Sequence, residues 1–291
     1  MPQTVKAKFL LGWMSRHEAM EALNSCVFNQ HLSDRKAIAL WKHYRDRVAN
    51  LEPRNPCPLP TLALTEAEQQ AVANHIQNLH AGPNGIYFSE MIKVHPGDLV
   101  ARQFYVLTEK AAQYEQEMQD EQNRINKCLG VGMSFAGQLV QRLVTPRRIA
   151  FYLPHAEFVP IPINVVNHLA PFTFKERDRY LTAVRTNGNR VLLWGGYHRV
   201  YALLRHMAGD AAGGAPLLTV MTGIPEVENF LNRPSFLRET VLGERPALVR
   251  DFLDEELFMT VDLRKKRAEG RIEIIRPGKL RAGVYPVDDD A

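Results

Sequence analysis

Apolar residues in the first 80 positions recur at intervals of three and four, which is the spacing of one face of an α-helix. The stretches with this pattern are 13–23, 33–51 and 65–79. Thr65 followed by Glu68 is typical of a capping box, in which each side chain bonds the backbone N–H of the other, and it marks the start of the third helix. The prolines between Pro53 and Pro60 predict a stiff, extended connection before that helix.

Strand-like and helical patterns follow one another after residue 90. Short apolar runs at 91–94 and 103–107 predict strands on either side of a Pro96-Gly97 turn. Thr108 begins a long polar helix that we expect to continue to about Cys128, with a narrow apolar stripe along one side. So narrow a stripe favours packing against one neighbouring element or against a second copy of the chain, which would make the protein a homodimer.

From Arg147 onward the pattern predicts a small α/β core. Apolar runs without helical spacing predict strands at 148–153, 158–163, 190–194 and 216–221. Thr173 and Glu176 repeat the capping-box pattern and predict a helix that ends at Gly188, while a second amphipathic stretch covers 197–207. Strand, helix, strand, helix and strand therefore alternate over residues 147–222.

The last part of the sequence predicts a helix and a hairpin. A helical stretch is expected from Pro225 to about Leu253, followed by strands at 257–263 and 271–275. The turn between these strands is basic and consists of Arg264, Lys265, Lys266 and Arg267. The expected fold class is α+β, with a mainly helical region at 1–146 and an α/β domain at 147–291 that carries this helix and hairpin.

Composition changes this picture only slightly. The chain has 291 residues, of which 45% are hydrophobic and 23% charged, so it can bury the cores of two domains in an ordinary soluble protein. Its net charge of +4 suits a phosphate-bearing ligand but is too small to indicate nucleic-acid binding on its own. The three cysteines lack Cys-x-x-Cys spacing, which argues against a zinc knuckle or a disulfide framework and favours a reducing compartment. The apolar run at 9–13 is too short for a signal peptide or a membrane span, so we expect a cytoplasmic protein of bacterial type without membrane contact.

The most informative segment is the break between the strand 190–194 and the helix 197–207. The sequence there is Gly195-Gly196-Tyr197-His198-Arg199. A helix N-terminus offers backbone N–H groups and the positive end of the helix dipole, which together favour an anion such as phosphate. The glycines let the main chain approach a ligand, and His198 and Arg199 add a side-chain donor and a permanent cation. Both side chains fall outside the apolar stripe, so we expect them to face a ligand; the alternative is a tight turn in which they pair with neighbours.

This segment and the pattern around it resemble the ParB/sulfiredoxin superfamily. The features that carry the resemblance are Val159-Pro160-Ile161, a capped helix ending near Asn187-Gly188, the apolar strand, and Gly195 to Arg199 followed by Ala202-Leu203. They cover about residues 157–222, and we recognise no family in the N-terminal half. The resemblance implies a ParB-like fold for this part and a nucleotide whose phosphates lie on Gly195, Gly196, Tyr197, His198 and Arg199.

Two positions depart from the enzymes of this superfamily. Sulfiredoxin carries Gly-Gly-Cys-His-Arg at this turn, and Tyr197 replaces its cysteine nucleophile, so sulfinic-acid repair is not open to this chain by that route. The free-serine kinases place an acidic residue where Gly195 stands, so their catalytic arrangement is also incomplete here. The resemblance therefore implies a phosphate cradle without specifying a reaction.

Three further segments are candidates for smaller roles. His168 lies in a loop from which this superfamily often contributes a second contact to nucleotide or substrate, and the alternative is a loop histidine without a role. Glu157 is a candidate general base on the condition that it faces the phosphate cradle; otherwise it is an exposed carboxylate. His155 with Glu157 gives two potential metal ligands but lacks a third. The glycine-rich stretch 130–137 follows a helix rather than a strand, so we expect a helix end there and not a dinucleotide loop.

Three functions are compatible with these features. The first is an NTPase or phosphotransferase that binds ATP or another NTP with Mg²⁺, in which Arg199 pairs with phosphate oxygens and His198 donates to the transferred phosphoryl group. The second is a DNA-associated, ParB-like clamp or nuclease that contacts DNA through the long polar helix and the basic turn 264–267. The third is a catalytically degenerate scaffold that binds a partner, which the absence of both the cysteine and the acidic residue favours.

Overall fold

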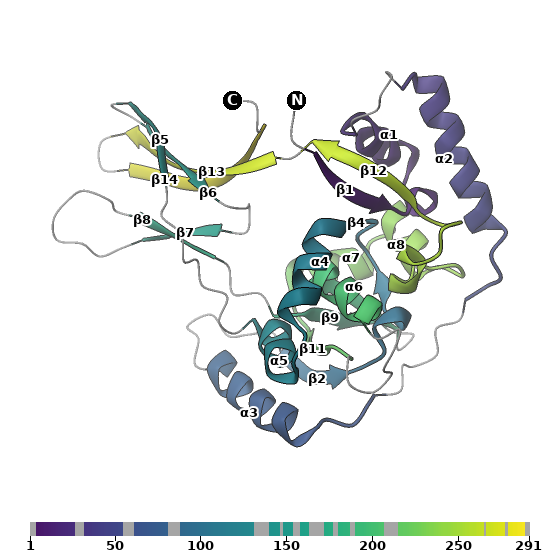
Figure 1. Ribbon diagram of the computed structural model, residues 1–291, viewed down its shortest axis with the longest axis horizontal. Coiled ribbons are helices and arrows are strands. Elements are labelled where there is room, and N and C mark those ends of the chain that lie inside the picture. Colours follow the sequence, from purple (N-terminus) through teal and green to yellow (C-terminus); the bar gives the residue numbers. More distant parts are fainter. Residues whose placement is uncertain are drawn as a thin grey trace. The chain divides into compact units, whose positions relative to one another are not determined.

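The chain divides into two compact units (Figure 1). The computed structural model describes residues 4–26, 32–54, 61–80, 88–130, 140–145, 148–153, 158–162, 172–176, 180–186, 190–206, 215–264, 266–276 and 279–288. One unit, here called the α/β unit, consists of Val5–Val131 and Arg179–Leu263. The other, the β unit, consists of Met1–Thr4, Gly132–Asp178 and Arg264–Ala291.

The domain boundary expected between residues 146 and 147 is wrong, because strands from both halves of the chain share one sheet. Strands β2 (Phe88–Lys93) and β3 (Val100–Ala101) come from the first half. They pair with β11 (Leu217–Met221) and β10 (Val191–Gly195), respectively, from the second half. The two halves therefore build a single core in the α/β unit.

The main sheet of the α/β unit has five strands in the order β2-β11-β9-β10-β3, where β9 is Thr182–Arg185. The pairs β11–β9 and β10–β3 are parallel, and the other two pairs are antiparallel. The central strands are mostly apolar and buried, as is typical of strands covered on both faces. A second sheet, in the order β12-β1-β4, contains Met259–Arg264, Thr4–Phe9 and Tyr105–Leu107.

The described helices of the α/β unit confirm most of the expected positions. They are α1 (Arg16–Asn24), α2 (Asp34–Ala49), α3 (Glu66–His80), α4 (Thr108–Glu117), α5 (Glu121–Leu129), α6 (Tyr197–His206), α7 (Pro225–Asn232) and α8 (Phe236–Leu242), with 3₁₀ turns η1 (Leu11–Trp13), η2 (Pro96–Asp98) and η3 (Val249–Phe252). The three N-terminal helices and the helix after Gly196 lie where the spacing places them. The proline-rich segment between α2 and α3 falls mostly outside the described residues.

Two expected helices are broken into shorter ones, each at a new cap. The helix expected from Thr108 to Cys128 is two helices, because the carboxylate of Asp120 accepts the N–H of Asn123 at 2.8 Å and begins α5 anew. The stretch from Pro225 to Leu253 is divided into α7, α8 and η3. Pro234 lacks the N–H that a continuing helix needs, and the hydroxyl of Ser235 then caps α8.

The helix expected from Thr173 to Gly188 does not form. Residues 172–176 are strand β8 (Phe172–Glu176), which pairs with β7 (Phe158–Pro162), and Ala183 and Val184 lie within the central strand β9. Because β9 lies between β10 and β11, Ala183 and Val184 are buried and their strand is hydrogen-bonded on both sides. This stabilisation outweighs the tendency of Thr173 to begin a helix. The strand-helix-strand core expected at 147–222 is therefore wrong in its first half, and the mixed α/β character is retained.

The β unit is an antiparallel assembly in the residues described. Its sheet has the order β14-β13-β6-β5, with β5 (Val140–Thr145), β6 (Arg148–Leu153), β13 (Lys266–Arg276) and β14 (Lys279–Asp288), and the β7–β8 pair is its second, two-stranded sheet. The strands expected at 148–153 and 158–163 are confirmed.

The basic hairpin expected at Arg264 to Arg267 is wrong. Strand β12 before it pairs with β1 in the α/β unit, whereas β13 after it pairs with β14 and β6 in the β unit. Lys265 lies outside the described residues. The partner of β13 follows Pro277-Gly278, residues that a tight turn favours, so the hairpin is made with the next strand along the chain and not with the preceding one.

A buried ionic cluster joins α3, β2 and α5. The carboxylate of Glu68, which is 0% exposed, lies 2.9 Å from Lys93 Nζ and 3.1 Å from Arg124 Nη2. Glu68 also completes the capping box with Thr65 that the sequence predicts. Burial alone raises the pKa of Glu68, but the hydrogen bonds from Lys93 and Thr65 and the nearby cations outweigh burial and hold the pKa below its ordinary value.

We predict that Glu68→Gln destabilises the fold by about 3–5 kcal/mol, because it leaves two buried cations without their carboxylate. The free energy of unfolding in urea measures this loss. Glu121→Gln is the matched control: Glu121 also faces Arg124, at 3.7 Å, but its side chain is half exposed, so its loss is expected to cost below about 1 kcal/mol. Equal losses in the two variants would contradict the prediction.

His75 on α3 gives the fold a dependence on pH. Its ring is 8% exposed and lies edge-on to the ring of Tyr180, with centroids 5.2 Å apart. Within the described part of the chain, Nε2 of His75 has no hydrogen-bond partner. Burial therefore lowers the pKa of His75 from its ordinary value.

We predict that stability falls as the pH drops below about 6.5, the ordinary histidine pKa. Below this pH the histidine is protonated in the unfolded chain but still neutral in the folded protein, so the unfolded state is favoured. The loss of stability is complete once the pH falls below the lowered pKa of His75 in the folded state. Urea unfolding at pH 7.5 and 5.5 measures the change, and His75→Leu should reduce it. His17→Gln, at a side chain that is 84% exposed, should leave it unaltered, and a His75→Leu protein with the full pH dependence would refute this assignment.

Candidate functional site

The turn between β10 and α6 leaves no room for side chains at its two glycines. Gly196 has a φ of +91°, in the left-handed region that L-residues avoid. A Cβ atom on Gly196 would lie 2.2 Å from Cδ2 of Leu181, and one on Gly195 would lie 2.7 Å from Oγ1 of Thr182. The strand-to-helix break that the two glycines predict is confirmed, and its glycines are required by packing as well as by conformation.

Tyr197 fastens the start of α6 to the ends of two strands. Its hydroxyl donates to the carbonyl oxygen of Leu193 in β10 and accepts the backbone N–H of Arg102, which follows β3, at 3.2 Å. Burial raises the pKa of the phenol to about 12. The side chain of Tyr197 is thus buried and hydrogen-bonded, and it serves as a structural link.

Arg199 does not face a ligand, contrary to the expectation from the helical pattern. It is 3% exposed, and its Nη1 donates to the carbonyl oxygen of Lys127 in the last turn of α5. Seven of the ten residues of α6 are buried, and Arg199 is one of them, so its side chain meets α5 and not solvent although it lies outside the apolar stripe. The role of a phosphate ligand therefore does not suit Arg199.

The bond from Arg199 is one of three that cap the C-terminal end of α5. Gly130, with a φ of 71°, ends the helix and donates its N–H to Asn126, which confirms the helix end expected there. Leu181 donates its N–H to the carbonyl oxygen of Cys128 at 2.7 Å. The guanidinium of Arg199 places a positive charge at the negative end of the α5 dipole.

Arg102 is the functional candidate that the sequence pattern missed. It follows β3 directly, and because Ala101 pairs with Leu193 in a parallel ladder, Arg102 lies beside Trp194 at the end of β10. Its guanidinium carbon is 3.9 Å from the centroid of the Trp194 ring. The short run before Arg102 gives no indication of which strand it adjoins, so only the pairing of β3 with β10 reveals this neighbour.

These residues define a site that we call the strand-end site. It consists of Arg102, Trp194, Gly195, Gly196 and His198, all of them partly exposed. His198 lies on the first turn of α6, between the buried Tyr197 and Arg199. A permanent cation and a helix N-terminus thus meet at the carboxyl ends of two adjacent parallel strands, the place where α/β sheets bind ligands.

Glu157 and His168 lie outside the described residues, as do Asn187-Gly188 and most of the glycine-rich stretch after Gly130. Within the residues that are described, no three His, Cys, Asp or Glu side chains are close enough together to hold a metal ion.

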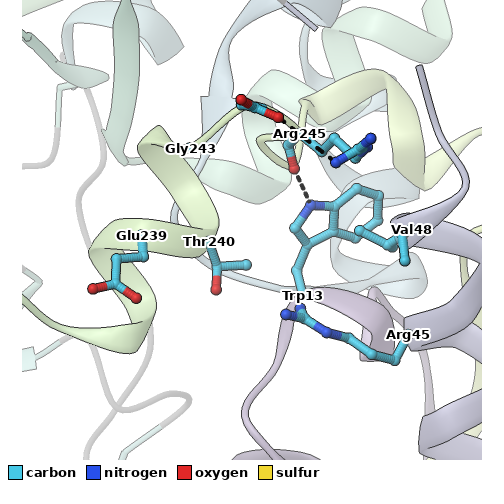
Figure 2. A pocket seen from close by; sticks show the side chains of 9 residues that line it. Trp13, Arg45, Val48, Glu239, Thr240, Gly243 and Arg245 are labelled. Carbon is cyan, nitrogen blue, oxygen red and sulfur yellow. Dashed lines mark hydrogen bonds and ion pairs between the residues drawn. The ribbon is translucent and has the colours of Figure 1, made fainter. Parts of the chain in front are cut away.

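A hollow lies between α2, α8 and the loop after α8 (Figure 2). It has a volume of about 230 Å³ and contains Trp13 at its base. The indole N–H of Trp13 donates to the carbonyl oxygen of Arg245 at 2.8 Å, while the guanidinium groups of Arg45 and Arg245 donate to Gly12 and Leu51, respectively. Both arginines donate to backbone carbonyl oxygens of the protein itself, so the hollow is a gap between packed elements and we assign no ligand to it.

No family model, no curated protein and no solved structure matches this chain. The likeness to the ParB/sulfiredoxin superfamily accordingly rests on the residues quoted above, and it stays a prediction. In the described part of the chain, none of the helices has the length and apolar character needed to cross a membrane.

We predict that Arg199→Met destabilises the fold by about 2–3 kcal/mol, because it removes a charge-assisted hydrogen bond from a buried carbonyl of α5. Thermal and urea unfolding test this. Arg205→Met on the same helix is the control, since Arg205 is 39% exposed and pairs with Glu115 at 3.4 Å; it should cost below about 1 kcal/mol. An Arg199→Met protein as stable as the control would show that the cap on α5 is dispensable.

Proposed function

We propose that the protein binds a nucleotide by its phosphates at the strand-end site. The observation that carries this proposal is the position of Arg102, whose guanidinium is stacked on Trp194 directly beside the Gly195-Gly196 turn. A fixed cation next to a glycine-lined helix N-terminus supplies both the charge and the backbone donors that a phosphate group requires.

The parts of the site would contribute differently. The N–H of Arg199 donates to the carbonyl oxygen of Gly196 at 3.0 Å. The N–H groups of Tyr197 and His198, which come before it, point toward the N-terminal end of α6, where a phosphate would accept them. Arg102 offers a planar fork of donors that matches two phosphate oxygens. His198 lies on the same turn; its Nε2 is buried, so a phosphate would accept from its other ring nitrogen, Nδ1. Arg199, which the sequence placed in this role, instead holds α5 in position behind the turn.

Magnesium would accompany a triphosphate through the phosphate oxygens. This is in keeping with Mg²⁺ sites that use few protein ligands and retain several waters. The residues described at the turn supply positive charge and hydrogen-bond donors, which stabilise charge on phosphate oxygens. The proposal is therefore one of binding, and phosphoryl transfer or hydrolysis would need a base in addition to these residues.

Calorimetric titration with ATP, CTP, GTP, UTP and inorganic tripolyphosphate, each with Mg²⁺, tests this function. Arg102→Ala should weaken binding by about tenfold to a hundredfold, the effect of losing a charge-assisted contact to phosphate. His198→Ala should weaken it by about tenfold. Arg205→Ala, which removes a cation from the far end of the same helix, is the control and should bind as the unmodified protein does.

The five probes separate the sources of affinity. Equal affinity for tripolyphosphate and the nucleotides would show that the site recognises only the phosphates. A preference for one nucleotide would show that it also recognises the base. The proposal fails if none of the five binds, or if both Arg102→Ala and His198→Ala leave the affinity unchanged. Far-ultraviolet circular dichroism of each variant establishes that the fold is retained.

A further inference from the structure

Trp194 stands out in its strand because it is large, aromatic and partly exposed. The three residues before it in β10 are at most 1% exposed and belong to the core. Trp194 instead lies at the end of the strand, with the guanidinium of Arg102 3.9 Å from its ring centroid. On another side its ring meets Phe230 of α7 edge-on, with centroids 5.8 Å apart and planes at 72°.

We infer that Trp194 is a positioning residue that holds Arg102 ready for a phosphate. This inference rests on the proposed function and adds to it the residue that orients the cation. Ala101 pairs with Leu193 in the parallel β3–β10 ladder, so Arg102 and Trp194 occupy neighbouring positions on the same face of the sheet. The contact is therefore fixed by the register of the two strands.

Stacking restricts Arg102 and does not itself use hydrogen-bonding groups; of the five N–H donors of the guanidinium, the side chain also directs a hydrogen bond to the hydroxyl of Tyr197. A guanidinium that lies on an aromatic face keeps its N–H donors in the plane of the fork, directed toward acceptors at its edge. The backbone of Arg102 is held as well, because its N–H donates to the hydroxyl of Tyr197 at 3.2 Å. An arginine held at both ends loses less rotational freedom when it binds an anion than a mobile surface arginine does, and so binds it more tightly.

Phe230 supplies the support for the ring itself. Its edge-on contact with Trp194 is the preferred geometry for two aromatic rings. Helix α7, which carries Phe230, follows β11 in the main sheet. The order of support thus runs from α7 through Phe230 and Trp194 to Arg102.

A double-mutant cycle with tripolyphosphate as the probe tests the inference. Trp194→Leu should weaken binding about tenfold, while Trp194→Tyr, which keeps an aromatic face, should restore most of the affinity. Because Trp194 acts through Arg102, the double variant Arg102→Ala with Trp194→Leu should bind no more weakly than Arg102→Ala alone. Trp41→Leu is the matched control: Trp41 is also partly buried, but its indole bonds Met14, and its loss should leave the affinity unchanged.

The outcomes distinguish this inference from the proposed function. If the unmodified protein does not bind tripolyphosphate, both are overturned. If it binds and Arg102→Ala loses the affinity, but Trp194→Leu binds normally or adds its full loss to that of Arg102→Ala, only the role of Trp194 is overturned.

A second cycle covers the case in which Trp194→Leu does not fold. It combines Trp194→Tyr with Arg102→Lys, whose ammonium has charge but no planar fork. The tyrosine should lower the affinity slightly beside Arg102 and leave it unaltered in the Arg102→Lys background. An equal loss in both backgrounds would overturn the positioning role.

Discussion

The packing of α6 is the constraint on which the α/β unit depends. This helix is buried over most of its surface and contacts α4, β4, η2 and η3, so its axis cannot shift without disturbing several elements at once (Figure 1). On its first turn the buried guanidinium of Arg199 bonds the carbonyl oxygen of Lys127, at the negative end of the α5 dipole. Because of this contact, Arg199, which the sequence pattern predicts to face a ligand, instead bonds a carbonyl oxygen inside the protein.

The strand-end site follows from this arrangement. Leu181 fills the space that a Cβ on Gly196 would need, and Gly196 has a left-handed backbone. The hydroxyl of Tyr197 bonds the carbonyl oxygen of Leu193 in β10 and the N–H of Arg102. The site's permanent cation therefore comes from a strand that is remote in the sequence and adjacent in the sheet. A parallel pair brings two carboxyl ends to one edge, and this edge is where Arg102 and the turn meet.

Features with a local cause could be predicted from the sequence, and features decided by a distant partner could not. The Thr65–Glu68 capping box, the Gly195-Gly196 break and the helix end at Gly130 each depend on residues a few positions apart, and all three are present. Thr173–Glu176 carries the same local signal as Thr65–Glu68 but pairs with β7, which lies outside its immediate sequence. The burial of Arg199 and the approach of Arg102 to Trp194 likewise depend on which elements become neighbours, and the mixed sheet joins strands from both halves of the chain.

The hydrogen bond between Leu181 and Cys128 has a consequence for how the chain is organised. The chain leaves the α/β unit after Val131 and returns to it at Arg179, so this bond, at 2.7 Å, holds the points of departure and return together. A segment whose two ends are fixed at neighbouring points can differ in length or content without changing the alignment of the strands that it interrupts along the chain. The main sheet can therefore tolerate the inserted residues 132–178 at this position much as it would tolerate a surface loop.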